Sequence, residues 1–265
     1  MRKPLLYSAT TFGNAERTWW QKTQNLLESL PESEIRVGAE AEFAAWLSVE
    51  QAATIREATQ DELSMYLSGS PRKMSIFRDR RPSEEFVEIC LQSNSTIMSV
   101  RLLEDWASNC SDVPNQKVRT SRNFSAPDSG GRRQEFVAPS ELRIAMNEFC
   151  RVWGQQNENA ENPVAIWLFV ALLNAHPFND GNGRLARSLL NVLLIQRGLL
   201  RGKAIPFGPL IYATQGNFEL AMGRAAIMNN WAPIMKTFYL LIEFYAGVYT
   251  DFERDMIDDR HPKRH

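Results

Sequence analysis

Residues 164–173 place the strongest constraint on the fold, because a helix through this run is apolar on every side. A helix with one solvent-facing side carries apolar residues on a single stripe, whereas a helix that is apolar all round lies inside a bundle. Asn162 and Pro163 suit the N-cap and the first position of this helix. A second apolar helix is expected over residues 184–197, with Gly198 placed to end it. The sequence therefore predicts a helical core built around two buried helices.

Helical periodicity also dominates the rest of the chain, so we predict an all-α fold. Ser83 and Ser140 are placed to cap two of the outer helices, each just before a helical stripe of apolar residues. Outer helices are expected at residues 14–30, from 83, from 140, at 217–228 and at 233–249, and a further helical region is expected over about 40–67.

Composition along the chain divides it into three parts. An amino-terminal helical region is expected over residues 1–80, a central domain over 83–250 and a charged tail over 251–265. Within the central domain, residues 111–138 lose the helical pattern and carry a Pro-Asp-Ser-Gly-Gly turn at 127–131. We interpret this segment as a β-hairpin or flap.

The charge balance limits the partners of the whole molecule. Thirty Lys and Arg residues are matched by 31 Asp and Glu residues, which leaves a formal net charge of -1. Such a protein is not drawn as a whole to nucleic acid or to an anionic membrane. Its longest strongly apolar run is also far shorter than the ~20 residues of a membrane-spanning helix. The sequence predicts no nucleic-acid or membrane partner, and a location in the cytoplasm or, for an effector, in the cytosol of a host cell.

The connection between the two buried helices gathers groups that bind phosphate. Gly181, Asn182 and Gly183 form a turn at the start of a helix, where backbone N–H groups and the positive end of the helix dipole favour an anion. Arg184 and Arg187 lie three positions apart, so they are neighbours on one helix face and can both reach that end. This combination suits a triphosphate.

The same connection, residues 176–187, also carries a base and a metal ligand. Asp180 supplies a hard oxygen of the kind that Mg²⁺ takes from one or two carboxylates beside substrate phosphates. His176 can accept a proton near neutral pH, and Phe178 is expected to bury its ring and anchor the loop. Each feature alone is commoner in an ordinary turn or on a solvated face. Their conjunction within one short connection favours a catalytic site.

Residues 176–187 read His-Pro-Phe-Asn-Asp-Gly-Asn-Gly-Arg-Leu-Ala-Arg and resemble the signature of the Fic family, H-P-F-x-[DE]-G-N-G-R-x-x-R, at every specified position. The order of elements is also similar to a Fic core over about residues 83–250. The resemblance implies a Fic-type helical bundle with a small β-hairpin flap and an amino-terminal helical extension. It further implies Mg²⁺-dependent transfer of AMP from ATP to a Ser, Thr or Tyr hydroxyl of a target protein, with release of pyrophosphate.

The resemblance also implies roles for individual residues. His176 would deprotonate the target hydroxyl, and Asp180 would hold Mg²⁺. The flap would align the main chain of the target by strand addition. The residues implied to bind the nucleotide are Gly181, Asn182, Gly183, Arg184 and Arg187, and the candidates for target docking on the flap are Arg119, Arg122 and Phe124.

Two positions bear on the type of reaction and on its control. Related Doc-like kinases carry a lysine where this chain has Gly183, so transfer of a terminal phosphate is disfavoured. Many Fic proteins carry an inhibitory glutamate that pairs with the second arginine of the motif. Residues 94–99 occupy what looks like the same place, and there Met98 replaces the glutamate. The resemblance then leaves three readings: constitutive activity, restraint by a separate antitoxin-like partner, or restraint by another glutamate.

Several alternatives stay open from the sequence. The transferred group could be UMP, GMP or phosphocholine rather than AMP, because the motif binds phosphates and does not fix the base. The chain could instead be a non-catalytic interaction scaffold, although the intact His176 and Asp180 argue against this. The sequence identifies neither the target protein nor the oligomeric state, and a homo-oligomer is one option.

Overall fold

The structure is a computed structural model that describes residues 12–31, 40–60, 98–125, 133, 135–155, 163–201 and 204–260. Within these ranges the chain is helical, which confirms the predicted all-α class. The helices are α1 (Asn14–Ser29), α2 (Glu40–Trp46), α3 (Val49–Thr59), α6 (Val100–Asn109), α7 (Pro139–Gly154), α8 (Val164–Ala175), α9 (Asn182–Gln196), α10 (Phe207–Ala213), α11 (Asn217–Met228) and α12 (Ala232–Arg260).

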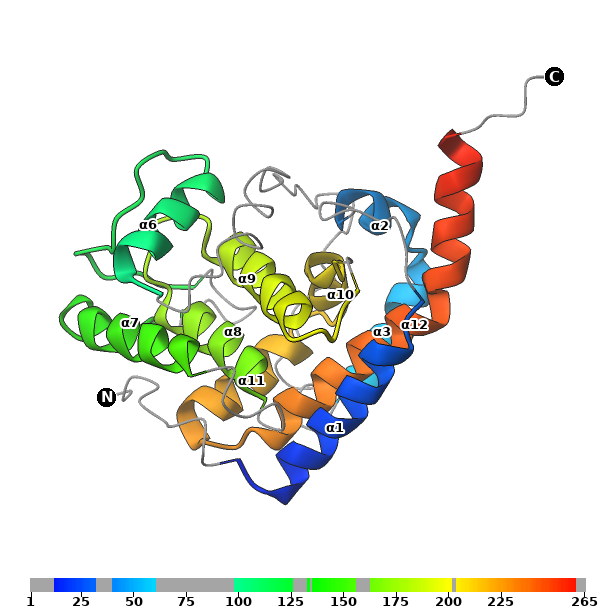
Figure 1. Cartoon of the computed structure of the whole chain (residues 1–265), viewed down its shortest axis with the longest axis horizontal. Coiled ribbons are helices and arrows are strands. Elements are labelled where there is room, and N and C mark those ends of the chain that lie inside the picture. The colour runs from blue at the N-terminus through cyan, green and yellow to red at the C-terminus, as the bar shows by residue number, and fades with distance from the viewer. Residues whose placement is uncertain are drawn as a thin grey trace.

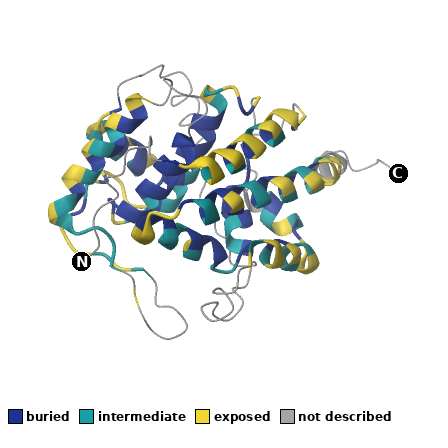
Figure 2. Cartoon of the chain, turned by 90° about the horizontal axis from the view of Figure 1, so that it is seen from below, coloured by how far each residue is buried: buried dark blue, intermediate teal, exposed yellow. Residues whose placement is uncertain are grey.

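Helix α8 lies at the centre of the bundle, as its apolar sequence predicts (Figure 1). All of its residues except Leu173 are buried. It packs against α7 on one side and α9 on another, and α9 buries most of its own length. Figure 2 shows the consequence: buried residues fill the inner helices, and exposed residues follow the outer faces of the peripheral ones. The two ends of the connection between α8 and α9 are therefore fixed by the core.

The amino-terminal helices join the same core rather than standing apart from it. Helix α1 packs along α12, and α3 contacts α10, α11 and α12 (Figure 1). Phe43 of α2 contacts the rings of Tyr245 and Phe252 on α12 edge to face, at centroid distances of 5.6 and 5.1 Å. These contacts bury a hydrophobic face of α12 that would otherwise meet water.

Several predicted boundaries are wrong, each for a local reason. The helical region expected over 40–67 is divided after Trp46, because Ser48 starts α3 with a capping box that Gln51 completes, and residues 61–67 lie outside the described residues. Helix α7 begins at Pro139, and its N-cap is Ala138, two residues before the expected cap Ser140. Helix α12 continues to Arg260, beyond the helix end expected at residue 249. The short helix α10 was not predicted.

Other predictions fall partly outside the described residues. This holds for most of the helix expected from Ser83 and for the domain boundary between residues 80 and 83. Where the description resumes, Met98 and Ser99 are not helical, and the Ser99 hydroxyl accepts a hydrogen bond from the Leu102 N–H at 3.2 Å to cap α6. The helix expected from Ser83 is therefore not continuous through this point.

The predicted flap is represented by one isolated antiparallel bridge between Phe124 and Glu135. The Phe136 N–H also donates to the Asn123 carbonyl at 3.1 Å. The turn predicted at 127–131 lies outside the described residues, so the hairpin itself stays a prediction. In the part of the chain that the structure describes, none of the helices combines the length and apolarity required to traverse a membrane.

Candidate active site between helices α8 and α9

The C-terminus of α8 sets the backbone of His176. This residue is the C-cap and lies in the left-handed region, with φ 47° and ψ 56°, while its N–H donates to the Leu172 carbonyl at 2.9 Å. A non-glycine residue in this conformation costs roughly 1 kcal/mol, so the surrounding contacts must hold it there. The prediction that His176 stands where the buried helix ends is confirmed.

Phe178 and Asn182 brace the loop that follows. The Phe178 ring is fully buried, as predicted for an anchor. The Asn182 side chain closes the loop on the main chain of Phe178: its Oδ1 accepts from the Phe178 N–H at 3.0 Å, and its Nδ2 donates to the Phe178 carbonyl at 2.8 Å. Asn182 is itself buried, so its side chain shapes the loop, and only its backbone is left to act in the predicted phosphate nest.

Gly181 is the N-cap of α9 and has φ 79°, a conformation that glycine adopts at little cost. A Cβ atom added there would lie 2.9 Å from the Cys110 carbonyl oxygen, so the close approach of α6 also requires glycine. No side chain caps α9. The first-turn N–H groups of this helix and its dipole are the groups from which the sequence predicts an anion site, and that site stays a prediction.

Asp180 accepts hydrogen bonds from several directions. Its Oδ2 accepts from the Ser111 hydroxyl at 2.8 Å and from the Asp112 N–H at 3.1 Å, and Arg184 reaches both oxygens, the nearer at 2.9 Å. Partial burial would raise the pKa of this carboxyl. The hydrogen bonds from Ser111, Asp112 and Gly181 and the charge of Arg184 outweigh burial and hold the pKa below its usual value. Asp180 is therefore an anionic oxygen donor throughout the neutral range.

Arg184 lies in the first turn of α9 and Arg187 in the second. Arg184 pairs with Asp180 at 2.9 Å and with Asp112 at 3.5 Å, and its side chain is largely buried. Arg187 passes beside Gly183, since a Cβ atom added to Gly183 would lie 3.3 Å from its Nη1. The structure thus brings the two guanidinium groups to the end of the helix where N–H groups and the positive dipole already gather.

The His176 imidazole stacks on the Phe136 ring, with a centroid distance of 4.0 Å and an angle of 10° between the ring planes. Burial and the positive charge of Arg119 lower the pKa of His176 to about 4, against smaller opposing effects of a hydrogen bond to the Leu173 carbonyl and of Asp180. A lowered pKa means that the neutral form persists until the pH falls to about 4. At neutral pH the ring is therefore available as a proton acceptor.

This protonation state is open to direct measurement. In ¹⁵N-histidine NMR spectra recorded from pH 8 downward, we expect the His176 ring to stay neutral through the region near pH ~6.5, where an unperturbed histidine titrates. Its signals should shift only as the pH approaches about 4. A midpoint near that of free histidine would show that burial and Arg119 do not control this ring.

The three residues predicted for target docking differ in their surroundings. Phe124 is 44% exposed, and Arg122 is exposed with an ion pair to Glu135 at 3.3 Å. Both can therefore meet a target, and their docking role stays a prediction. Arg119 is buried, and its guanidinium donates to main-chain carbonyls, among them that of His176 at 2.7 Å. The expectation that the Arg119 side chain docks a target is wrong, because it is enclosed within the fold.

Met98, the residue predicted to replace an inhibitory glutamate, is buried in the hydrophobic core. Its side chain packs among apolar residues and carries no charge that could pair with Arg187. The other residues of segment 94–99, apart from Ser99, lie outside the described residues, so the comparison with an inhibitory helix stays a prediction.

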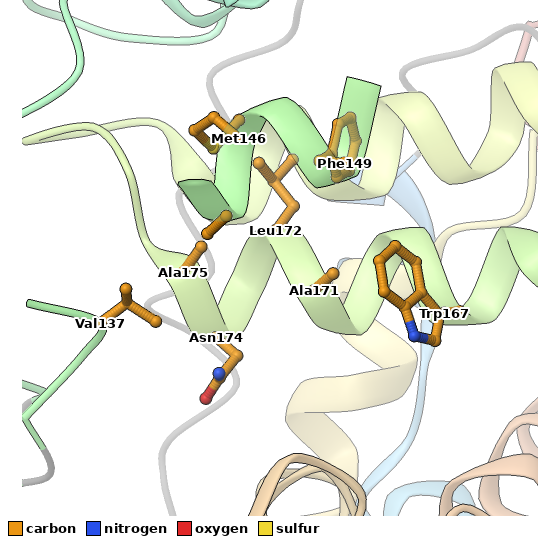
Figure 3. A pocket seen from close by; sticks show the side chains of 9 residues that line it. Val137, Met146, Phe149, Trp167, Ala171, Leu172, Asn174 and Ala175 are labelled. Carbon is orange, nitrogen blue, oxygen red and sulfur yellow. The ribbon is translucent and has the colours of Figure 1, made fainter. Parts of the chain in front are cut away.

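A small pocket lies between α7 and α8, beside the site rather than within it (Figure 3). Val137 at the end of the flap and Ala175 at the end of α8 belong to its lining, together with Met146, Phe149, Trp167 and Leu172. Its lining is mainly apolar and contains none of the motif residues. It is therefore not where phosphates would bind, but it marks the place where the flap meets the end of α8.

Sequence reasoning missed three contributors to this geometry. Ser111 donates a hydrogen bond to Asp180, Phe136 stacks on His176, and Arg119 donates to the His176 carbonyl of the loop. The polar residue after α6 and the phenylalanine of the flap carry no signal of their own in the sequence. Only their approach to the motif in space reveals them.

The comparisons with known proteins agree with this geometry. Residues 97–194 match the model of the Fic/DOC family. Over 83 residues, 27% of the chain, the sequence is 37% identical to Protein adenylyltransferase Fic of Drosophila persimilis. It is 35% identical over the same length to the protein of that name from Drosophila melanogaster. The chain spans only 16% and 17% of the lengths of these two relatives.

Solved structures share the fold at low sequence identity. A Fic family protein from Desulfovibrio desulfuricans superposes with a TM-score of 0.56 at 14% identity, covering 94% of this chain and 77% of that one. Fic-1 from C. elegans superposes with a TM-score of 0.51 at 14% identity, covering 92% and 72%.

The fold and the site together are those of an all-α bundle that holds this loop between two buried helices. Residues 97–194 of this chain match the Fic/DOC family model, and the similar solved structures share the fold of the chain.

Proposed function

We propose that this protein is a protein adenylyltransferase, which transfers AMP from ATP to a Ser, Thr or Tyr hydroxyl of a target protein. The observation that carries the proposal is the joint placement of a neutral His176, the Asp180 carboxylate and the uncapped start of α9 on one loop. A base, an oxygen donor and an anion site are the groups that nucleotidyl transfer requires. The name of the Drosophila relatives supports the same reaction.

In this proposal His176 accepts the proton of the attacking hydroxyl. The hydroxyl oxygen forms a bond to the α-phosphorus of ATP, the bond from that phosphorus to the bridging oxygen breaks, and pyrophosphate leaves. Arg184 and Arg187 at the start of α9 hold the β and γ phosphates and stabilise the negative charge that builds on the leaving group. Arg184 would exchange part of its pairing with Asp180 for phosphate oxygens when the nucleotide binds.

The residues present suit Mg²⁺ as the accompanying ion. The described residues contain no cluster of three or more His, Cys, Asp or Glu side chains that could form an all-protein metal site. Asp180, however, is partly exposed, and the Asp112 carboxylate lies beside the same arginine. One or two carboxylates completed by phosphate oxygens is the usual way in which Mg²⁺ is held with a nucleotide. When bound there, Mg²⁺ would neutralise phosphate charge.

The target protein would be held along the flap. Phe124 and Arg122 are exposed side chains of the flap, and the main chain of the target would add to the flap as a strand. Restraint by a separate antitoxin-like partner and assembly into a homo-oligomer both stay predictions. A location in the cytoplasm or in a host cytosol is likewise part of this proposal.

A label-transfer experiment tests the reaction and the choice of nucleotide together. The protein is incubated with Mg²⁺, a cell lysate and each of the four α-³²P nucleoside triphosphates in turn, with γ-³²P ATP in parallel. We expect protein bands labelled from α-³²P ATP and not from γ-³²P ATP. Labelling from the γ position alone would indicate a kinase. Stronger labelling from UTP or GTP would show that the transferred group is UMP or GMP rather than AMP. No label from any nucleotide would favour a scaffold.

A further inference from the structure

Arg119 is a buried cation whose guanidinium donates to four main-chain carbonyls. Its Nε donates to His176 at 2.7 Å, its Nη1 to Ser121 at 2.7 Å, and its Nη2 to Val137 at 2.5 Å and Ala175 at 3.2 Å. None of these acceptors is a carboxylate, and no ion pair of Arg119 is present among the described residues. The side chain is thus committed to the main chain of three separate segments.

The chemistry of these segments explains why a planar, multidentate cation is needed. The last carbonyls of α8 have no partner within the helix and carry the negative end of its dipole. The carbonyls of Ser121 and Val137 belong to the two sides of the flap, which a single bridge joins. Buried carbonyls without a donor are costly, and one guanidinium supplies donors in several directions. Arg119 therefore replaces the missing sheet and helix bonds at this junction.

The same guanidinium joins the two parts that orient the histidine ring. On the α8 side it binds the His176 carbonyl, and the Arg119 N–H binds the next carbonyl, that of Pro177, at 2.8 Å. On the flap side it binds Val137, the neighbour of Phe136, whose ring stacks on His176. Figure 3 shows the junction from the pocket, where Val137 comes from the flap and Ala175 from the end of α8.

We propose that Arg119 is a positioning residue that locks the left-handed backbone of His176 and the stacking ring of Phe136 into one unit. The expected effect of Arg119 on catalysis rests on the proposed transfer function. It touches no reacting atom: it acts by holding the imidazole stacked on the Phe136 ring. The buried Arg119 thus contributes to the site from 57 residues away in the chain.

The test uses two substitutions and two readouts. Arg119→Met removes all the donors and the charge, while Arg119→Lys keeps the charge but loses the planar fork. We expect the kcat for transfer to fall about 10- to 100-fold in Arg119→Met, the scale for misplacement of a catalytic group by about 1 Å. The Kd for ATP should change by less than about threefold, because the effect lies on the chemical step. Arg119→Lys should recover part of the loss.

The second readout needs no substrate. Stacking on Phe136 gives the His176 ring protons a ring-current shift in the NMR spectrum, and this shift should diminish in both variants. Arg143→Met is the matched control, because Arg143 is an exposed arginine on α7. It should leave kcat, Kd and the ring shift unchanged. Thermal unfolding of each variant identifies any that fails to fold. If Arg119→Met does not fold, kcat and the ring shift of Arg119→Lys decide whether the proposal holds.

Two results would overturn the proposal. One is a folded Arg119 variant with wild-type kcat and a wild-type ring shift. The other is a weakening of ATP binding by the same factor as the fall in kcat, which would assign Arg119 to general folding or to the nucleotide site. If the wild-type protein transfers no nucleotide, the proposed function fails, and the ring shift alone still decides whether Arg119 holds the histidine.

Discussion

Replacement of His176 by asparagine should lower the rate of nucleotide transfer about 10²- to 10⁴-fold, the contribution expected of a general base. Asparagine is the suitable variant because it tolerates the left-handed conformation that His176 adopts at φ 47°. His176→Ala removes the same base but places alanine in that strained conformation. The measurement is the initial rate of label transfer from α-³²P ATP, with protein folding checked by thermal unfolding.

The two variants separate chemistry from folding. If His176→Asn is as inactive as His176→Ala and unfolds near the wild-type temperature, the loss lies in the base. ATP affinity should stay within about threefold of wild type, because the histidine is assigned to the transition state and not to nucleotide binding. An asparagine variant that transfers AMP at half the wild-type rate would remove His176 from the mechanism.

Replacement of Asp180 by asparagine should produce the second large effect, a fall in transfer of about 10²-fold or more, because the metal-binding charge is worth several kcal/mol to phosphoryl chemistry. The substitution also releases Arg184 from its ion pair at 2.9 Å. ATP binding in the presence of EDTA should therefore be unchanged or tighter, whereas the increase in affinity on adding Mg²⁺ should disappear. Calorimetric titrations with and without Mg²⁺ measure both.

Ser111→Ala is the matched control for this substitution. It removes the 2.8 Å hydrogen bond to the Asp180 carboxylate but leaves the charge in place. We expect a change of only a few-fold, which corresponds to a single hydrogen bond of about 1 kcal/mol. If Asp180→Asn retains its Mg²⁺-dependent ATP binding, the ion is not held by this carboxylate.

Much of the fold could be predicted because its decisive elements are local. The run at 164–173 is apolar all round, and this property alone predicts a central helix. Gly198 has φ 71° just beyond α9, as expected of a glycine that ends a helix. The errors at Ser140 and at residue 249 concern helix ends, where one competing cap or a few more packing contacts move the boundary.

The site was predictable where its parts are contiguous. His176, Asp180 and the motif arginines share one loop and the first two turns of one helix, so their spacing alone predicts that they meet. The contacts of Phe136 and Arg119 with that loop depend on how the chain returns to it. Arg119 is a docking candidate in the sequence only because the resemblance implies a flap within residues 119–124. Arg119 is buried because it donates to main-chain carbonyls that need a donor, and these carbonyls come together only in the folded protein.

The most direct test of the central claim is the mass of the product. Proteins labelled from α-³²P ATP in a lysate are digested and analysed by mass spectrometry, with the His176→Asn variant in parallel. The predicted result is an AMP group on a Ser, Thr or Tyr hydroxyl that is present with wild-type protein and absent with the variant. A phosphate group in its place, or an AMP group that forms equally with His176→Asn, would contradict the assignment of this loop as an AMP-transfer site.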